Sequence, residues 1–298
     1  MEPLKPFKTY EEQVEHLKSV HGLIISDEKW AVGILSKVNY YRLSAYGISL
    51  RDPKNKDKYR PGTSLVDLKG LYNFDAFFRT ILFLPISEIE VQFRTKVAYQ
   101  LGKKYGPEGY KDPTNFKSTI NRKTQKTRHQ EFLDKLNEEI DRQQNLPCVK
   151  HHKNKYGGHF PIWAAIELLS FGNVASLYSI MKSSDQREVA KEFKTDAYHL
   201  HSWMLALVEI RNICAHSNRV YNMPLKQPPK LYAEHSKYGK TNKVFPVILV
   251  IKRLLQGQHL WDTFAKSLKT AMDNRFIDIK CLGFPNEWKS VLDITDNT

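Results

Sequence analysis

Apolar residues recur at intervals of three and four along most of this 298-residue chain, which is the spacing of one face of an α-helix. The longest such pattern starts after Ser64, runs through residues 65–82 and resumes beyond Pro85 as far as Gly106. It predicts a very long helix, and we expect Pro85 to kink that helix because proline removes one backbone donor. No alternating apolar and polar run is long enough to require a sheet, so the pattern predicts an all-α protein.

Two shorter helical patterns lie near the start of the chain. Thr9 and Glu12 have the spacing of a capping box for the first helix, and Ser26 is expected to cap the second, which continues to about Leu43. Two helices joined by a four-residue turn would also suit a DNA-reading module over residues 9–44. The second helix is mostly apolar where a recognition helix should be polar, so a DNA-binding regulator is the weaker alternative.

A basic, proline-bearing segment at residues 51–63 separates these short patterns from the long one. We therefore interpret residues 1–50 as an N-terminal helical extension and residues 51–298 as a helical domain with basic inserted segments. The longest apolar stretches are far shorter than the roughly 20 residues that a bilayer span requires. The first residues lack the apolar region of a signal peptide, and three widely spaced cysteines suit a reducing compartment. We expect a cytoplasmic protein that has no membrane partner.

A helix predicted over residues 197–216 carries polar residues where their burial is costly. Its end reads Glu209-Ile-Arg211-Asn212-Ile-Cys-Ala-His216, and buried polar groups destabilise a fold unless they find partners. On a helical wheel the core stripe surrounds Ile210. The opposite face carries three further apolar residues, which are Met204, Leu205 and Val208. This helix must therefore be covered on both faces, and a second chain is one candidate for that cover.

The charge of the chain favours a polyanionic partner. With 46 Lys and Arg against 32 Asp and Glu, the formal net charge is +14 and the pI is about 9.5. Basic segments with interleaved Tyr, Phe and His lie at 51–60, 102–104, 117–128 and 150–155, and such residues hold phosphates and stack on unpaired bases. We expect contacts with RNA from the following residues: Arg94, Lys103, Lys104, Lys150, His151, His152, Lys153, Lys155 and Arg219.

Two residues of the polar helix end suit metal-independent cleavage of RNA. Histidine can deprotonate the 2′-hydroxyl because its pKa lies near neutrality, so His216 is the candidate base. The planar guanidinium of Arg211 matches phosphate oxygens. The residue types alone leave another interpretation open, in which Arg211 forms a structural ion pair with Glu209 or another acid and His216 ends the helix.

Two other motifs invite simpler interpretations. Cys148, His151, His152 and His159 resemble a ligand cluster, but their spacing fits no zinc pattern. We interpret this segment as a solvated basic loop that touches RNA, and we expect neither a metal nor a cofactor. The segment that ends in Trp163 is interpreted as packing, with the indole in the core.

The order of several motifs along the chain resembles the abortive-infection Abi-D/Abi-F family of the HEPN superfamily. Arg211-Asn212-x-x-x-His216 is similar to the HEPN motif, and the rest of the resemblance covers most of the chain. It rests on these segments: Lys5-Pro-Phe-Lys-Thr-Tyr10 with Gln13 and Leu17, Gly22-Leu-Ile-Ile-Ser-Asp27, Asn39-Tyr-Tyr-Arg-Leu-Ser44, Glu88-x-Glu90-x-x-x-Arg94-Thr-Lys96, Phe160-Pro-Ile-Trp163 with Glu167, Ser170-Phe-Gly172, Arg219-Val-Tyr-Asn222 and Leu282-Gly-Phe284. Related sequences often have a second histidine after the first, where this chain has Ser217.

The resemblance implies a HEPN-like helical bundle and a role in bacterial defence against phage. It implies a metal-independent endoribonuclease site in which Arg211 and His216 are catalytic and Asn212 orients the histidine or the phosphate. It also implies association with a structured small RNA and a homodimer that joins two copies of the motif. A non-catalytic RNA-binding scaffold, which forms a ribonucleoprotein with a cognate small RNA, remains the alternative.

Overall fold

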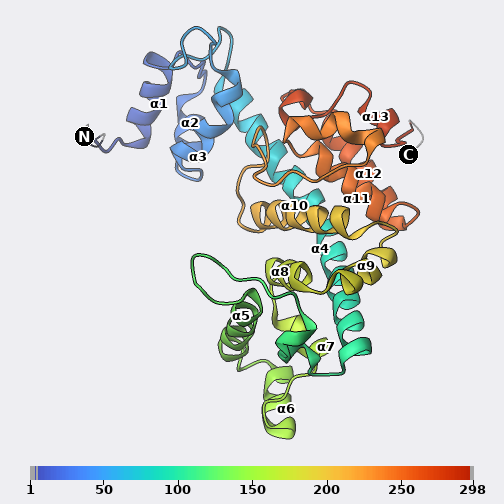
Figure 1. The fold of residues 1–298 in the computed structure, drawn as a ribbon. Helices are drawn as coiled ribbons and strands as arrows, with labels where there is room; N and C mark the ends of the chain where they lie inside the picture. The colour runs from blue at the N-terminus through green and yellow to red at the C-terminus, as the bar shows by residue number, and fades with distance from the viewer. Residues whose placement is uncertain (1–3, 5, 296–298) are drawn as a thin grey trace.

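A computed structural model describes residue 4 and residues 6–295, and within them the chain is all-α, as the sequence predicted (Figure 1). The signal-peptide expectation and the first resemblance segment rest partly on residues 1–3 and 5, which lie outside the described residues. The α-helices are α1 Tyr10–Ser19, α2 Glu28–Leu35, α3 Tyr40–Ser44, α4 Leu65–Tyr105, α5 Arg128–Arg142, α6 Pro147–Tyr156, α7 Ile162–Ala165, α8 Phe171–Ile180, α9 Ser183–Glu192, α10 Ala197–Ala215, α11 Phe245–Leu255, α12 His259–Met272 and α13 Trp288–Val291. The 3₁₀ helices are η1 Ala45–Leu50, η2 Gly109–Lys111, η3 Pro113–Asn115, η4 Ile166–Leu168, η5 Ala233–Thr241 and η6 Ile279–Leu282.

The 41-residue helix α4 is the axis of the molecule, and α7, α8, α9, α10, α11 and α12 all pack against it (Figure 1). A capping box of Ser64 and Asp67 starts it, and Gly106 ends it with φ of +77°, a conformation that glycine adopts without a Cβ penalty. Pro85 lies buried inside this helix and does not end it. One element therefore connects the N-terminal helices to the rest of the chain.

The described residues form two hydrophobic clusters. The larger one surrounds α4, α8, α10, α11 and α12, and the smaller one lies among α1, α2 and α3. The smaller cluster also takes in Tyr59, Leu65 and Leu68, so the first turn of α4 completes the core of the N-terminal helices. The boundary at residues 50 and 51 stays a prediction.

Four helices of the same chain, α4, α8, α9 and α11, pack against α10. Of the three apolar residues on the face opposite Ile210, Met204 has no exposed surface, whereas Leu205 and Val208 are half-buried. The chain itself therefore covers much of both faces, and a second chain at this helix stays a prediction.

Three local predictions from the sequence were wrong. The segment that contains Lys150 is the helix α6 and not a loop, because Pro147 suits the first helical turn and Gly157 ends the helix in the left-handed conformation. Trp163 is 58% exposed and does not lie in the core. The second helix is capped by Asp27 instead of Ser26, and the Asp27 carboxylate accepts the Trp30 N–H at 2.8 Å.

Candidate functional site

The polar end of α10 lies where this helix crosses α4. Asp196 caps the start of α10 by accepting the His199 N–H at 2.9 Å, and the helix ends at His216, as the sequence predicted. Arg211 is partly buried, whereas Asn212 and His216 are exposed. The imidazole of His216 makes no hydrogen bond to any described residue, which leaves the ring open to a ligand.

Glu90 of α4 joins two arginines at this crossing. Its Oε2 accepts a hydrogen bond from Arg211 Nε at 3.2 Å, and its Oε1 accepts one from Arg94 at 2.9 Å. The Glu90 side chain is only 9% exposed. Because two guanidinium groups share one carboxylate, the cluster keeps one net positive charge, and we call Glu90, Arg94 and Arg211 the arginine cluster.

One nitrogen of the arginine cluster, Arg94 Nε, has no hydrogen-bond partner among the described residues. Arg94 donates to the Leu169 carbonyl at 3.0 Å, and Glu167 lies 4.0 Å from it. Arg94 Nε is buried, and a buried donor without a partner is costly. The accessible cation of this cluster is Arg211, whose side chain is 29% exposed and whose guanidinium suits a phosphate.

A second buried cluster anchors the chain just after the motif. Asp75 of α4 has no exposed surface, and its carboxylate accepts the backbone N–H groups of Val220 and Tyr221 at 3.1 and 2.7 Å. Tyr46 and Arg79 also donate to it. Burial raises the pKa of Asp75, and these hydrogen bonds oppose that shift.

Sequence reasoning missed Asp75. A carboxylate four residues before an arginine, inside the otherwise apolar run from Phe74 to Phe78, is the signal that could have found this residue. Because Asp75 binds the backbone four and five residues beyond His216, it fixes the position of the chain that follows the motif.

The N-terminal helices reach the same end of α10. Arg42 of α3 donates to the carbonyl of Ser217 at 2.6 Å, and Ser217 has a left-handed φ of +53°. Arg219 donates to the carbonyl of Ala45 in η1. The residues that follow His216 are therefore held between α4 and the N-terminal extension.

Cys214 is not a nucleophile at this site. Burial raises the pKa of its thiol to about 12, so the thiol stays protonated at neutral pH. Its role is packing, since it lies against the larger hydrophobic cluster.

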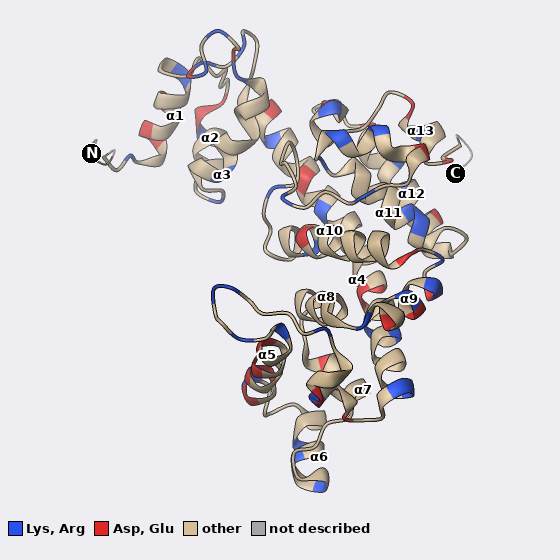
Figure 2. Ribbon diagram, viewed as in Figure 1, with Lys and Arg blue, Asp and Glu red and all other residues tan. Residues whose placement is uncertain are grey.

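The structure does not gather the expected RNA-contact residues into one site. Arg94 lies beside Arg211, but Lys150, His151, His152, Lys153 and Lys155 lie on α6, at the far end of the molecule from α10 (Figures 1 and 2). Two of the other expected residues have partners within the chain: Lys104 pairs with Asp185 at 2.5 Å, and Arg219 holds η1. Lys103 has its ammonium group 5.9 Å from the Tyr99 ring.

The histidines near Cys148 do not form a metal site. His159 pairs with Glu108 at 3.0 Å, and His152 stacks near Phe160. No group of three or more His, Cys, Asp or Glu among the described residues could hold a metal ion. Over the same residues, no helix is long and apolar enough to cross a bilayer.

These observations define an all-helical protein whose helix α10 ends in an Arg-Asn-x-x-x-His motif, with the net positive arginine cluster, in which Glu90 and Arg94 are nearly buried, at that end of the helix. A family model described as "Abi-like protein" matches residues 33–222. The chain belongs to this family, which associates it with abortive infection, a form of phage defence. No significant match was found among curated proteins or among solved structures.

Proposed function

We propose that this protein binds RNA in bacterial abortive infection and cleaves it without a metal at Arg211, Asn212 and His216. The observation that carries the proposal is the convergence of Arg94 and Arg211 on Glu90 at the end of α10, where His216 is exposed. The net positive charge of the cluster suits a phosphodiester, and His216 is free to act on the ribose next to it. In this proposal Asn212, whose Oδ1 lies 3.5 Å from Arg211, orients the phosphate or the histidine.

The proposed reaction is attack of the ribose 2′-oxygen on the adjacent phosphorus. His216 takes the proton of the 2′-hydroxyl, a bond forms between the 2′-oxygen and phosphorus, and the bond from phosphorus to the 5′-oxygen breaks. The products are a 2′,3′-cyclic phosphate and a 5′-hydroxyl, whose oxygen takes a proton from solvent or from a second acid. The His216 of a second copy would be such an acid, so a homodimer through the motif is part of the proposal.

The test combines two variants with one control. His216→Ala and Arg211→Ala should abolish RNA cleavage and cellular toxicity while leaving the melting temperature within a few degrees of the wild type. His259→Ala, an exposed histidine at the start of α12, should cleave as the wild type does. Cleavage retained by both motif variants would refute the assignment.

A non-catalytic RNA-binding scaffold is the second candidate. The observation that favours it is the His216 ring, which has no described partner to set its tautomer, whereas a catalytic base is normally oriented by a neighbouring group. This candidate predicts a co-purifying small RNA of defined length and no cleavage at any protein concentration. Sequencing the RNA that co-purifies with the wild type and with His216→Ala separates the two candidates, and a preference for duplex DNA would instead indicate a DNA-binding regulator.

A further inference from the structure

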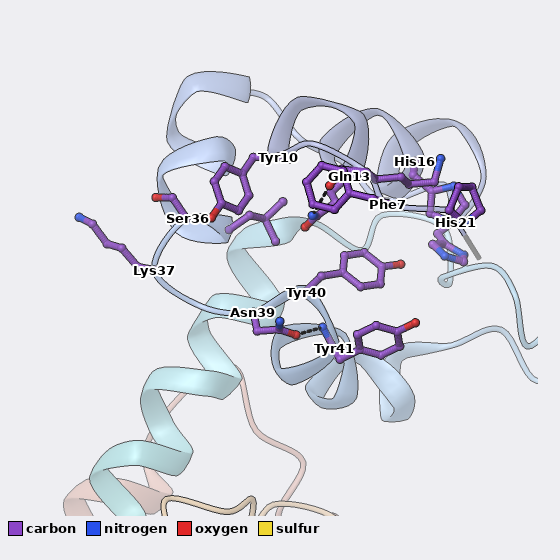
Figure 3. Close-up of a pocket in the computed structure, with 13 residues that line it drawn as sticks. Phe7, Tyr10, Gln13, His16, His21, Ser36, Lys37, Asn39, Tyr40 and Tyr41 are labelled. Atoms are coloured by element: carbon purple, nitrogen blue, oxygen red, sulfur yellow. Dashed lines mark hydrogen bonds between the residues drawn. The ribbon is translucent and has the colours of Figure 1, made fainter. Parts of the chain in front are cut away.

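The N-terminal extension contains an aromatic pocket that the proposed cleavage site does not use. Its volume is about 540 Å³, within the range of roughly 300–1,000 Å³ that small-molecule sites occupy. Two motif segments that are distant in sequence line it, one around Phe7 and Tyr10 and the other at Asn39-Tyr40-Tyr41 (Figure 3). We call it the aromatic pocket.

Short-range interactions hold both segments in place. Gln13 of α1 donates from its side-chain amide to the Lys8 carbonyl at 2.9 Å, which keeps the segment before α1 over that helix. Asn39 caps α3 by accepting the Tyr41 N–H at 2.9 Å. These two hydrogen bonds therefore help to hold the aromatic side chains of two separate segments around one cavity.

The aromatic rings offer flat surfaces to a ligand. Tyr40 and Tyr41 are perpendicular, with their centroids 5.7 Å apart, and they face Phe7 and Tyr10 across the cavity in Figure 3. Tyr41 is 74% exposed, and Phe7 is exposed as well. The floor is the buried Leu35 of α2. A group of exposed aromatic side chains around a cavity marks a binding site and not a core.

The charge around the aromatic pocket selects an anionic ligand. Lys8 and Lys37 lie on its rim with His16 and His21, and none of the described residues that line it is acidic. The two hollows beside Trp163 differ in that each has an acidic residue in its lining, Glu167 beside Lys103 in one and Glu108 beside three histidines in the other. A ligand with a flat ring and a phosphate fits both features of the aromatic pocket.

Helix α3 links the aromatic pocket to the Arg211-Asn212-x-x-x-His216 motif. Tyr41 lines the pocket, its neighbour Arg42 donates to the Ser217 carbonyl, and Ser217 directly follows His216. Helix α3 therefore contacts the end of the motif and also contributes to the aromatic pocket.

We propose that the aromatic pocket binds one unpaired nucleotide, with its base stacked on Tyr41 and its phosphate beside Lys8 and Lys37. The inference rests on the proposed function in that the nucleotide belongs to an RNA strand passing the arginine cluster. The pocket then selects RNA with an unpaired base at a set distance from the cleaved bond. Stacking carries the interaction, since every base has a π-face, and the lysines add salt-dependent attraction.

The experiment uses the full-length protein and a single-stranded 2′-O-methyl RNA that contains one 2-aminopurine. This RNA lacks the 2′-hydroxyl, so its binding is measured without cleavage. Quenching of 2-aminopurine should report stacking, and Tyr41→Ala should weaken binding by about 5- to 150-fold, the cost of losing one stacked base. Tyr41→Phe keeps the ring and should bind as the wild type does, as should Tyr198→Ala, which removes an exposed tyrosine outside the pocket.

Three further measurements complete the test. Phe7→Ala, an exposed position, should weaken binding in the same way and guards against a folding defect in one variant. Lys37→Gln should reduce the salt dependence of binding by about one unit of slope. Free AMP is titrated in parallel: weak or absent competition by AMP supports the RNA strand as the source, whereas competition at equal affinity assigns the pocket to a free nucleotide.

The outcomes separate this inference from the proposed function. Equal affinity of the wild type, Tyr41→Ala and Phe7→Ala for the oligonucleotide overturns the pocket, even when unmodified RNA is cleaved in a His216-dependent manner. Tyr41-dependent binding with no cleavage of unmodified RNA upholds the pocket and removes the ribonuclease.

Discussion

Replacement of Glu90 by glutamine is the most direct test of the arginine cluster. The variant keeps one oxygen acceptor but removes the charge that two guanidinium groups share. Breaking a buried ion pair by neutralising one partner costs about 3–5 kcal/mol, whereas exposed pairs contribute about 0–1 kcal/mol. The Arg94 and Glu90 side chains are 12% and 9% exposed, but Arg211 is 29% exposed, which discounts its share.

We therefore expect Glu90→Gln to lower the free energy of unfolding by about 2–4 kcal/mol. At about 2–4 °C per kcal/mol, the value for chains somewhat shorter than this one, the melting temperature should fall by about 4–16 °C. Urea unfolding followed by circular dichroism gives the free energy, and calorimetry gives the melting temperature. The double variant Glu90→Met/Arg94→Met measures coupling, and it should lose less than the sum of the two single variants.

Glu88→Gln is the matched control, because Glu88 lies on the same helix, is exposed, and accepts a side-chain hydrogen bond from Gln92 at 3.1 Å but forms no ion pair among the described residues. It should change the free energy of unfolding by less than about 0.5 kcal/mol. If Glu90→Gln behaves like this control, the arginine cluster does not stabilise the fold.

Three further predictions concern other parts of the chain. Trp163→Ala should cost less than about 1 kcal/mol, measured by urea unfolding, because the indole is 58% exposed; a loss of about 3–5 kcal/mol would restore the core interpretation. Cys148 is exposed, whereas burial raises the thiol pKa of Cys214 to about 12. Ellman's reagent at pH 8 should therefore modify Cys148 well before Cys214. Rapid modification of Cys214 in a Cys148→Ser variant would contradict this. Burial of Asp185 acts to raise its pKa. Its hydrogen bonds, of which the one from Lys104 has the largest effect, outweigh burial and lower the pKa below 3.8. Because its folded-state pKa is depressed, its contribution to stability should be present above about pH 4 and lost as the pH falls below that value. Asp185→Asn should flatten the acid limb of the stability curve, and an unchanged limb would count against the ion pair.

The helical content and the ends of the main helices could be predicted from the sequence because they depend on local signals. The spacing of apolar residues marked α4 and α10, and the capping box at Thr9 marked α1. The same signals failed where long-range packing decides: the exposure of Trp163 depends on which helices lie over α7. Helix α6 was missed because its basic residues suggested solvent, although Pro147 and Gly157 at its two ends are local helix signals.

By itself, the sequence determined an all-α chain, its basic charge and the position of the Arg211-Asn212-x-x-x-His216 motif at the end of a helix. Only the tertiary structure decided that Glu90 and Arg94 lie beside Arg211, that Asp75 holds Val220 and Tyr221, and that Phe7 meets Tyr41 around one cavity. The physical reason is the sequence separation between the residues that interact. Helix formation depends on residues three or four positions apart, whereas the Glu90 to Arg211 contact joins residues 121 positions apart and forms only when α4 and α10 pack.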